Sequence, residues 1–247
     1  MSAPALVLLA YGSRDARATL VVQQYADALR TQRTDLAVCT AFLRHGRTAE
    51  QAVSELAARG HTEAVIVPLL LTGGRHAAVE LPAAVERTRQ AHPEVRVAVA
   101  DRLGLRPAWL GVLDERLRTP LRRDGVRELD ALVLASAGSS DPAVSAAVGR
   151  LARTWSQVHR LPVVTAYAAV TGPSTGEAVR TLRREGRRHV AIGSLFLAPG
   201  SMSDRAAELA LEAGAAAVSA PLGFDEVMAE QVLHRYQVAA MRSMTLA

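Results

Sequence analysis

Two glycine-containing loops carry the side chains of this sequence that could do chemistry. One is Tyr11-Gly-Ser-Arg-Asp15 and the other is Thr72-Gly-Gly-Arg-His76, and each loop follows an apolar run. The imidazole of His76 could bind a metal ion or accept a proton near neutral pH. The phenol of Tyr11 is the second candidate for a catalytic or metal-binding group. These residue types predict acid–base or metal chemistry beside a group of arginines that attracts anions.

The other residues of the two loops are candidates for substrate binding. Glycine permits tight turns and close approach of a ligand to the backbone, and arginine binds carboxylates through paired hydrogen bonds. The predicted substrate-binding residues are Gly12, Ser13, Arg14, Gly73, Gly74 and Arg75. A simpler interpretation stays open, in which the first loop is a plain turn whose Ser13 or Asp15 caps a helix. A lone histidine such as His76 can equally be structural.

His45 is the third candidate metal ligand, after His76 and Tyr11. It lies just after another apolar run and could reach the same site, although a solvated loop histidine is an equal alternative. The remaining histidines show no i, i+4 pairing of the kind found in helical metal sites.

Short apolar runs rich in Val, Ile and Leu alternate with helical patterns along the chain, which predicts an α/β fold with parallel sheets. The predicted strands are Leu6–Ala10, Ala37–Leu43, Ala64–Leu71, Val95–Ala100, Ala131–Ser136, Val163–Ala169, His189–Leu197 and Ala216–Ala220. The predicted helices are Ala16–Gln32, Ala49–Arg59, Val79–Ala91, Pro107–Arg122, Pro142–Val158, Ser174–Glu185, Asp204–Ala213 and Asp225–Met241. Tyr11, His45 and His76 then follow three strands of one sheet and should share its carboxyl edge, where ligands bind.

An internal repeat divides the chain. LVLLAYGSRD at residue 6 aligns with LVLASAGSSD at residue 132, and PLLLTGGRH at residue 68 aligns with SLFLAPGSM at residue 194, both with an offset of 126. We therefore predict two similar lobes, residues 1–124 and 125–247, each a four-stranded parallel sheet flanked by helices, with a cleft between them. Ala137 and Met202 replace Tyr11 and His76 in the second lobe, which should supply hydrogen bonds to the substrate through Ser139, Ser140, Ser201 and Arg205.

Composition limits the function classes. The chain has 247 residues and a net charge of +5, and all its basic residues are arginine. Because the arginines are scattered and no nucleic-acid motif is present, a small anionic ligand is a better prediction than DNA or RNA. The single cysteine, Cys39, predicts a reducing compartment and hence the cytoplasm. The apolar run Ala5–Ala10 is too short for a membrane span, so no membrane partner is expected.

These loops resemble the class II chelatases that act on sirohydrochlorin, the cobaltochelatases and ferrochelatases, in their two-repeat, actinobacterial-like form. The matching segments are LLAYGSRDARA, AVIVPLLLTGGRHAAVELPAAV, LVLASAGSSDPA and IGSLFLAPGSMSDR. With the strand order and the repeat, the resemblance covers nearly the whole chain. The resemblance implies insertion of Fe²⁺ or Co²⁺, with Ni²⁺ a further possibility, into an anionic tetrapyrrole for sirohaem or cobalamin synthesis. It implies no cofactor beyond the metal substrate, and it places His76 on an active-site histidine of the family.

The sequence departs from that family at two positions. Tyr11 stands where the family has histidine, and Arg44 stands where it often has an acidic residue. A neutral phenol is a poor ligand for Fe or Co, whereas imidazole suits both metals. The loss of two probable ligands bears directly on whether the chain is catalytic.

Three hypotheses follow. The first is a chelatase in which His76 acts with Tyr11 or His45. The second is a non-catalytic relative that binds a tetrapyrrole or a metal. The third is an enzyme with different chemistry in the same cleft, because a fold does not fix a function. The sequence leaves a monomer and a homodimer equally open.

Overall fold

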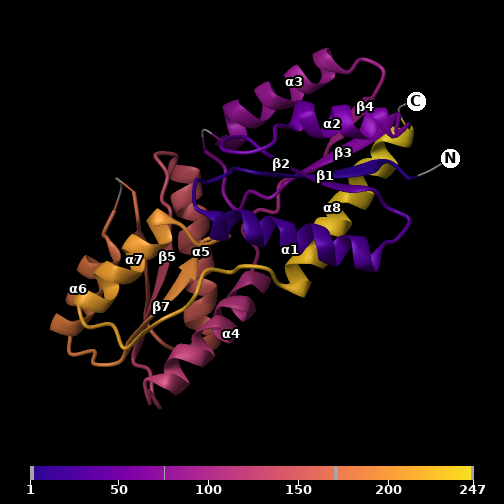
Figure 1. Ribbon diagram of the computed structural model, residues 1–247. Helices are drawn as coiled ribbons and strands as arrows, with labels where there is room; N and C mark the ends of the chain where they lie inside the picture. Colours follow the sequence, from indigo (N-terminus) through magenta and orange to yellow (C-terminus); the bar gives the residue numbers. More distant parts are fainter. Residues whose placement is uncertain (1–2, 75, 170–171, 246–247) are drawn as a thin grey trace. The chain divides into compact units, whose positions relative to one another are not determined.

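The computed structural model describes residues 3–74, 76–169 and 172–245, and for residues 76, 244 and 245 it describes the backbone without the side chain. The chain divides into two compact units (Figure 1). Unit 1 comprises Met1–Gly104 and Phe224–Ala247, and unit 2 comprises Leu105–Gly223. Within the described ranges, no helix is both long enough and apolar enough to cross a membrane.

Unit 1 contains a four-stranded parallel sheet in the order β2-β1-β3-β4. All six residues of β1 are buried, as expected for a central strand covered on both faces. Helices α2 and α3 cover one face of this sheet, and α1 and α8 cover the other (Figure 1). The elements are β1 Ala5–Ala10, α1 Ala16–Gln32, β2 Val38–Phe42, α2 Ala49–Ala58, β3 Glu63–Pro68, the π-helical turn η1 His76–Glu80, α3 Leu81–Ala91, β4 Arg96–Val99 and α8 Glu226–Thr245.

Unit 2 repeats this architecture, with strand order β6-β5-β7-β8 and parallel pairing throughout. Helices α6 and α7 cover one face of the sheet, and α4 and α5 cover the other (Figure 1). The elements are α4 Ala108–Arg123, β5 Ala131–Ser136, α5 Pro142–His159, β6 Val163–Tyr167, α6 Thr175–Arg184, β7 Val190–Leu195, α7 Ser201–Glu212 and β8 Ala217–Val218. The predicted fold class, two four-stranded parallel sheets flanked by helices, is therefore confirmed.

The division into units does not coincide with the predicted boundary between residues 124 and 125. Helix α4 packs on β7 and β8 of unit 2, and α8 packs on β3 and β4 of unit 1. In unit 2, a Cβ on Gly193 of β7 would lie 3.3 Å from Leu113 of α4, so the helix sits directly on the strand. In unit 1, the Tyr236 hydroxyl of α8 donates to the Pro4 carbonyl at 2.6 Å. Each unit thus contains one helix that the sequence repeat assigned to the other.

The internal repeat extends to individual hydrogen bonds. Thr48 caps α2 through a reciprocal pair of bonds with Gln51, and Ser174 caps α6 in the same way with Glu177. These cap residues are separated by the predicted offset of 126 residues. The capping boxes fix the start of equivalent helices, so the local sequence encodes the same β–loop–α geometry twice.

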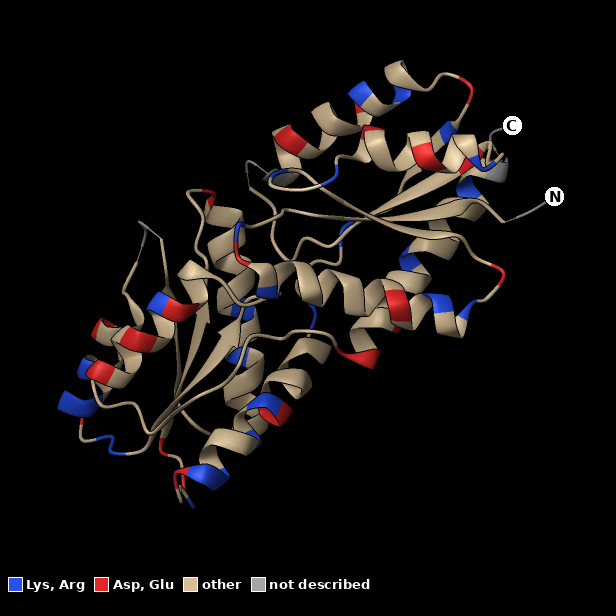
Figure 2. Cartoon of the chain, viewed as in Figure 1, with Lys and Arg blue, Asp and Glu red and all other residues tan. Residues whose placement is uncertain are grey.

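Charged residues lie mainly on helices and loops, while the strands are largely uncharged (Figure 2). Arginines and acidic residues are interspersed along the helices rather than collected on one helix (Figure 2). This distribution matches the expectation of scattered arginines.

Candidate functional site

The carboxyl edge of the unit 1 sheet begins with the turn after β1. Gly12 adopts φ +92°, and a Cβ at this position would lie 1.7 Å from the Arg44 carbonyl oxygen, so only glycine fits. The Ser13 hydroxyl accepts a hydrogen bond from the Asp15 backbone N–H at 3.1 Å. The Asp15 carboxylate in turn caps α1. Asp15 therefore caps the helix, as the simpler interpretation of this loop predicted, while Ser13 stabilises the turn before it.

Two candidates of this turn have side chains that reach the surface. The Tyr11 side chain is 37% exposed, and Arg14 is exposed. Both follow β1 directly, so they lie at the edge where the sequence predicted them. An exposed aromatic ring beside an arginine suits a ligand that is both flat and anionic.

The loop after β2 is tied to this turn through main-chain bonds. Leu43 donates its N–H to the Ala10 carbonyl at 2.9 Å, and Arg44 donates to the Tyr11 carbonyl at 2.8 Å. His45, the next residue, is exposed and has φ +51°. The structure thus places His45 at the predicted edge.

An ion pair joins this loop to η1. The Arg44 Nε donates to Oε2 of Glu80 at 3.1 Å, and its Nη2 donates to Oε1 at 3.2 Å. The Glu80 side chain is only 18% exposed, against 52% for Arg44. The hydrogen bonds to Glu80, its negative charge and the nearby Tyr11 phenol all raise the pKa of the Arg44 guanidinium. We call Tyr11, Arg44 and Glu80 the edge cluster.

The loop after β3 leads into the same cluster. Gly74 has φ +82°, and its carbonyl accepts the Ala78 N–H at 2.9 Å, which joins the loop to η1. His76 is the first residue of η1, so its backbone lies on the turn that also carries Glu80. The His76 side chain and the whole of Arg75 lie outside the described part of the structure.

Metal binding by the predicted ligands is left open by the described residues. Among the side chains that the structure describes, no group of three or more His, Cys, Asp or Glu could hold a metal ion. The predicted metal ligands His76, Tyr11 and His45 therefore stay predictions.

The predicted substrate-binding residues of unit 2 follow its own β–α loops. The Ser139 hydroxyl accepts the Asp141 N–H at 3.1 Å, which repeats the Ser13–Asp15 turn. Arg205 lies in α7 and pairs with Glu208 at 3.4 Å. Their role in substrate binding stays a prediction.

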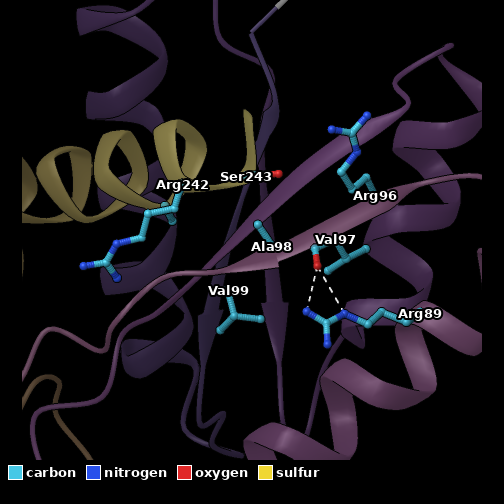
Figure 3. Close-up of a pocket in the computed structure, with 8 residues that line it drawn as sticks. Arg89, Arg96, Val97, Ala98, Val99, Arg242 and Ser243 are labelled. Carbon is cyan, nitrogen blue, oxygen red and sulfur yellow. Dashed lines mark hydrogen bonds between the residues drawn. The ribbon is translucent and has the colours of Figure 1, made fainter. Parts of the chain in front are cut away.

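A groove of about 450 Å³ lies elsewhere in unit 1, along the outer edge of β4. The Arg89 guanidinium donates to the Val97 carbonyl at 3.1 and 2.9 Å (Figure 3). Arg96 pairs with Glu63 at 3.2 Å. The lining residues include no imidazole, carboxylate or thiol, and Arg89 satisfies a carbonyl of the edge strand β4.

Comparison with known proteins sets this edge in context. The family model CbiX matches residues 5–119 and again 131–239, which together make up most of the chain. The chain belongs to the CbiX family. The double match also agrees with the internal repeat, since one model fits each half.

Two curated relatives of this CbiX chain come from Priestia megaterium. A sirohydrochlorin cobaltochelatase is 25% identical over 173 residues, which are 69% of this chain and 56% of the relative. A sirohydrochlorin ferrochelatase is 25% identical over 193 residues, 76% of this chain and 72% of that protein. The chain thus matches little more than half the length of the cobaltochelatase.

A solved structure shares the fold. SirB from Bacillus subtilis with Fe³⁺ superposes with a TM-score of 0.80 at 21% identity, covering 98% of each chain. This chain therefore has the same fold as SirB.

One functional candidate of this CbiX chain escaped the sequence analysis. The motif around His76 includes an acidic residue at Glu80, but nothing in the sequence showed that its partner is Arg44, 36 residues earlier. The available signal was the arginine that follows β2, since Arg44 stands where the family often has an acidic residue.

Proposed function

We propose that this CbiX chain inserts Fe²⁺ or Co²⁺ into sirohydrochlorin. The observation that carries the proposal is the convergence of the family's motif loops at one sheet edge, where β1, β2 and η1 bring the edge cluster and the His76 backbone together. The names of the two curated relatives support the reaction and the choice of metals.

The proposed chemistry needs three contributions from the protein. Arg14 and Arg44 attract the carboxylates of the tetrapyrrole. The exposed surfaces of Tyr11 and of Val79, which are 37% and 57% exposed, give its flat face an apolar contact. His76 accepts a pyrrole proton as the metal enters from the same side.

The test is an absorbance assay with sirohydrochlorin and Fe²⁺ or Co²⁺. The wild-type rate should exceed the spontaneous rate, and His76→Ala should reduce the enzymatic part at least tenfold. His61→Ala is the matched control, because His61 precedes β3 and so lies toward the opposite edge of the sheet. A wild-type rate equal to the spontaneous rate contradicts the proposal.

A second function is favoured by Arg44, which pairs with Glu80. This arginine places a positive charge where the family often has an acidic residue. In this alternative the chain binds the tetrapyrrole without turnover, as a carrier or regulator. Tight binding with no metal insertion, and recovery of insertion in Tyr11→His, would support it.

The remaining parts of the proposal rest on sequence. The cytoplasm is proposed from the single Cys39, with the tetrapyrrole and the metal as the substrates and no further cofactor. A monomer and a homodimer are both compatible with it.

A further inference from the structure

The two outer strands of the unit 1 sheet differ in how their open sides are covered. Main-chain groups of successive residues in a parallel strand point alternately toward and away from the neighbouring strand. In β2, the Val38 and Thr40 carbonyls point away from β1, and arginine side chains occupy both of them. Arg30 donates to the Val38 carbonyl at 3.2 and 2.7 Å. Arg47 donates to the Thr40 carbonyl at 2.9 and 2.7 Å.

The other outer strand, β4, keeps part of its open side uncovered. Arg96 and Ala100 donate their N–H groups to carbonyls on the β3 side, so Val97 and Val99 turn their N–H and C=O groups away from the sheet. The Arg89 guanidinium occupies only the Val97 carbonyl, at 3.1 and 2.9 Å. Among the described residues, no hydrogen bond engages the Val97 N–H or the Val99 main chain on this side. An extended chain can therefore still pair with β4 here.

The groove described above lies on this open side of β4, and two helices form its walls. Helix α3 contributes Arg89 from one face of the sheet (Figure 3). Helix α8 contributes Ala239, Arg242 and Ser243 from the other face (Figure 3). We call these residues, with the strand Arg96–Val99 at the floor, the β4 groove. An open strand edge at the floor of a groove is a place where an extended peptide can add a strand to a sheet.

The charge of the β4 groove favours an acidic partner. Arg89, Arg96 and Arg242 line the groove, and no carboxylate does. Arg96 pairs with Glu63 at 3.2 Å, whereas the exposed Arg242 has no ion pair or hydrogen bond in the described part of the chain. The Arg96 and Arg242 guanidiniums point in different directions (Figure 3). They therefore suit acidic groups spread along an extended chain better than a single compact anion.

A second copy of this chain fits the β4 groove poorly. Pairing of β4 with the β4 of another copy would bring three arginines against the same three, and like charges across a strand pair are destabilising. The β2 strand of another copy already has its Val38 and Thr40 carbonyls occupied. An acidic segment instead neutralises the arginines of the groove.

We propose that the β4 groove binds an extended acidic segment of a partner protein, which adds a strand to the unit 1 sheet. The Val97 N–H and the Val99 main chain hold the backbone of the segment, and Arg96 and Arg242 hold its acidic side chains. The contact is short, because β4 has only 4 residues, so the complex is weak and transient. This inference does not depend on metal insertion.

The experiment measures binding of a fluorescein-labelled peptide, acetyl-EVEVEVE-amide, to the full chain by fluorescence anisotropy. Its alternation matches the two-residue period of a strand. We expect saturable binding with a Kd below about 1 mM. A peptide with lysine in place of every glutamate should not bind. The inference is overturned if the acidic peptide shows no saturable binding, or if the lysine peptide binds equally well.

A methylated peptide separates strand addition from charge attraction. Methylation of every backbone nitrogen keeps the negative charge and removes all main-chain donors of the peptide. This form should bind about tenfold more weakly or worse, because two or more hydrogen bonds are lost. Equal binding of the two forms would show attraction by charge alone and would overturn the inference.

Arg242→Gln tests the charged wall of the groove and should weaken peptide binding about two- to fivefold. Arg59→Gln is the matched control, because Arg59 is an exposed arginine at the end of α2 in the same unit and does not line the groove. Its affinity for the peptide should change less than about 1.5-fold. Equal weakening in the two variants would show an effect of net charge alone, against the inference.

Val99→Pro tests the strand edge itself. Proline is tolerated on edge strands, and here it removes one outward N–H without breaking a bond of the sheet. Peptide binding should weaken about fivefold. If Val99→Pro does not fold, amide hydrogen exchange of the wild-type chain, followed by NMR, gives the same test, since the Val97 and Val99 N–H groups must exchange more slowly when the peptide is bound. Unchanged exchange at both positions, or unchanged affinity in Val99→Pro, places the peptide elsewhere and refutes strand addition at β4.

Discussion

Replacement of Gly12 by alanine should destabilise unit 1 through the contact between its two edge loops. Gly12 has φ +92°, a conformation that costs alanine about 1–2 kcal/mol. The new Cβ would also lie 1.7 Å from the Arg44 carbonyl, which is backbone and cannot rotate away. The loop must then move and lose the 2.8 Å bond from Arg44 to Tyr11, for a further cost of about 1–3 kcal/mol.

The internal repeat supplies a control for this substitution. Gly138 stands at the same place in unit 2 with φ +83°, but a Cβ there would lie 3.2 Å from the Tyr167 Cβ and 3.3 Å from the Ala169 carbonyl. Gly138→Ala should therefore cost only about 1–2 kcal/mol, mainly from the backbone conformation. The expected total for Gly12→Ala is about 2–5 kcal/mol.

Both variants are compared by thermal and urea unfolding followed by circular dichroism. Each kcal/mol should lower the unfolding midpoint by about 2–4 °C. Gly12→Ala must show the larger decrease, together with weaker tetrapyrrole binding because Arg44 moves. Equal decreases in the two variants, or a larger one in Gly138→Ala, would refute the reasoning from steric contact.

Two further predictions concern unit 2. Asp114→Ala leaves the fully buried Trp155 without the 2.9 Å acceptor of its indole N–H, so stability should fall by about 1–3 kcal/mol in urea unfolding followed by tryptophan fluorescence. Glu115→Ala, on the exposed side of the same helix, should change the stability little. Equal losses of stability in the two variants would contradict the prediction. The capping bonds lower the pKa of the Glu177 carboxyl group. The contribution of this carboxylate to stability is therefore complete above its pKa in the unfolded chain, about 4.3. That contribution is lost as the pH falls through the lower pKa of the folded state. Glu177→Gln, which copies Gln51 of the first repeat, should flatten the dependence of the urea midpoint on pH between about 5 and 3, and an unchanged slope would count against this.

Local features of the chain were predictable from sequence because they depend on neighbouring residues. The apolar run at Ala5–Ala10 and the repeat 126 residues later identified both central strands. Parallel strands then placed Tyr11 and His45 at one edge, as the structure shows.

Long-range features were not predictable in the same way. The periodicity of α4 and α8 identified their apolar faces, but an apolar face can pack on either sheet, so the exchange of these helices was missed. The prediction of a helix from Val79 also overlooked the turn at His76–Glu80, whose π geometry depends on contacts rather than on propensity. The Arg44–Glu80 pair joins residues from two separate loops, and no spacing rule relates them.

The exchange of α4 and α8 has a consequence for how the protein is made. Residues 105–223 emerge from the ribosome as one continuous stretch and make up the whole of unit 2. Unit 1 starts first, but the part of its sheet that α8 covers, over β3 and β4, stays open until the residues from 224 onward are synthesised. The middle of the chain can therefore finish folding before its beginning, and a nascent chain stopped near residue 223 exposes the apolar residues that Met228, Val232 and Tyr236 would cover.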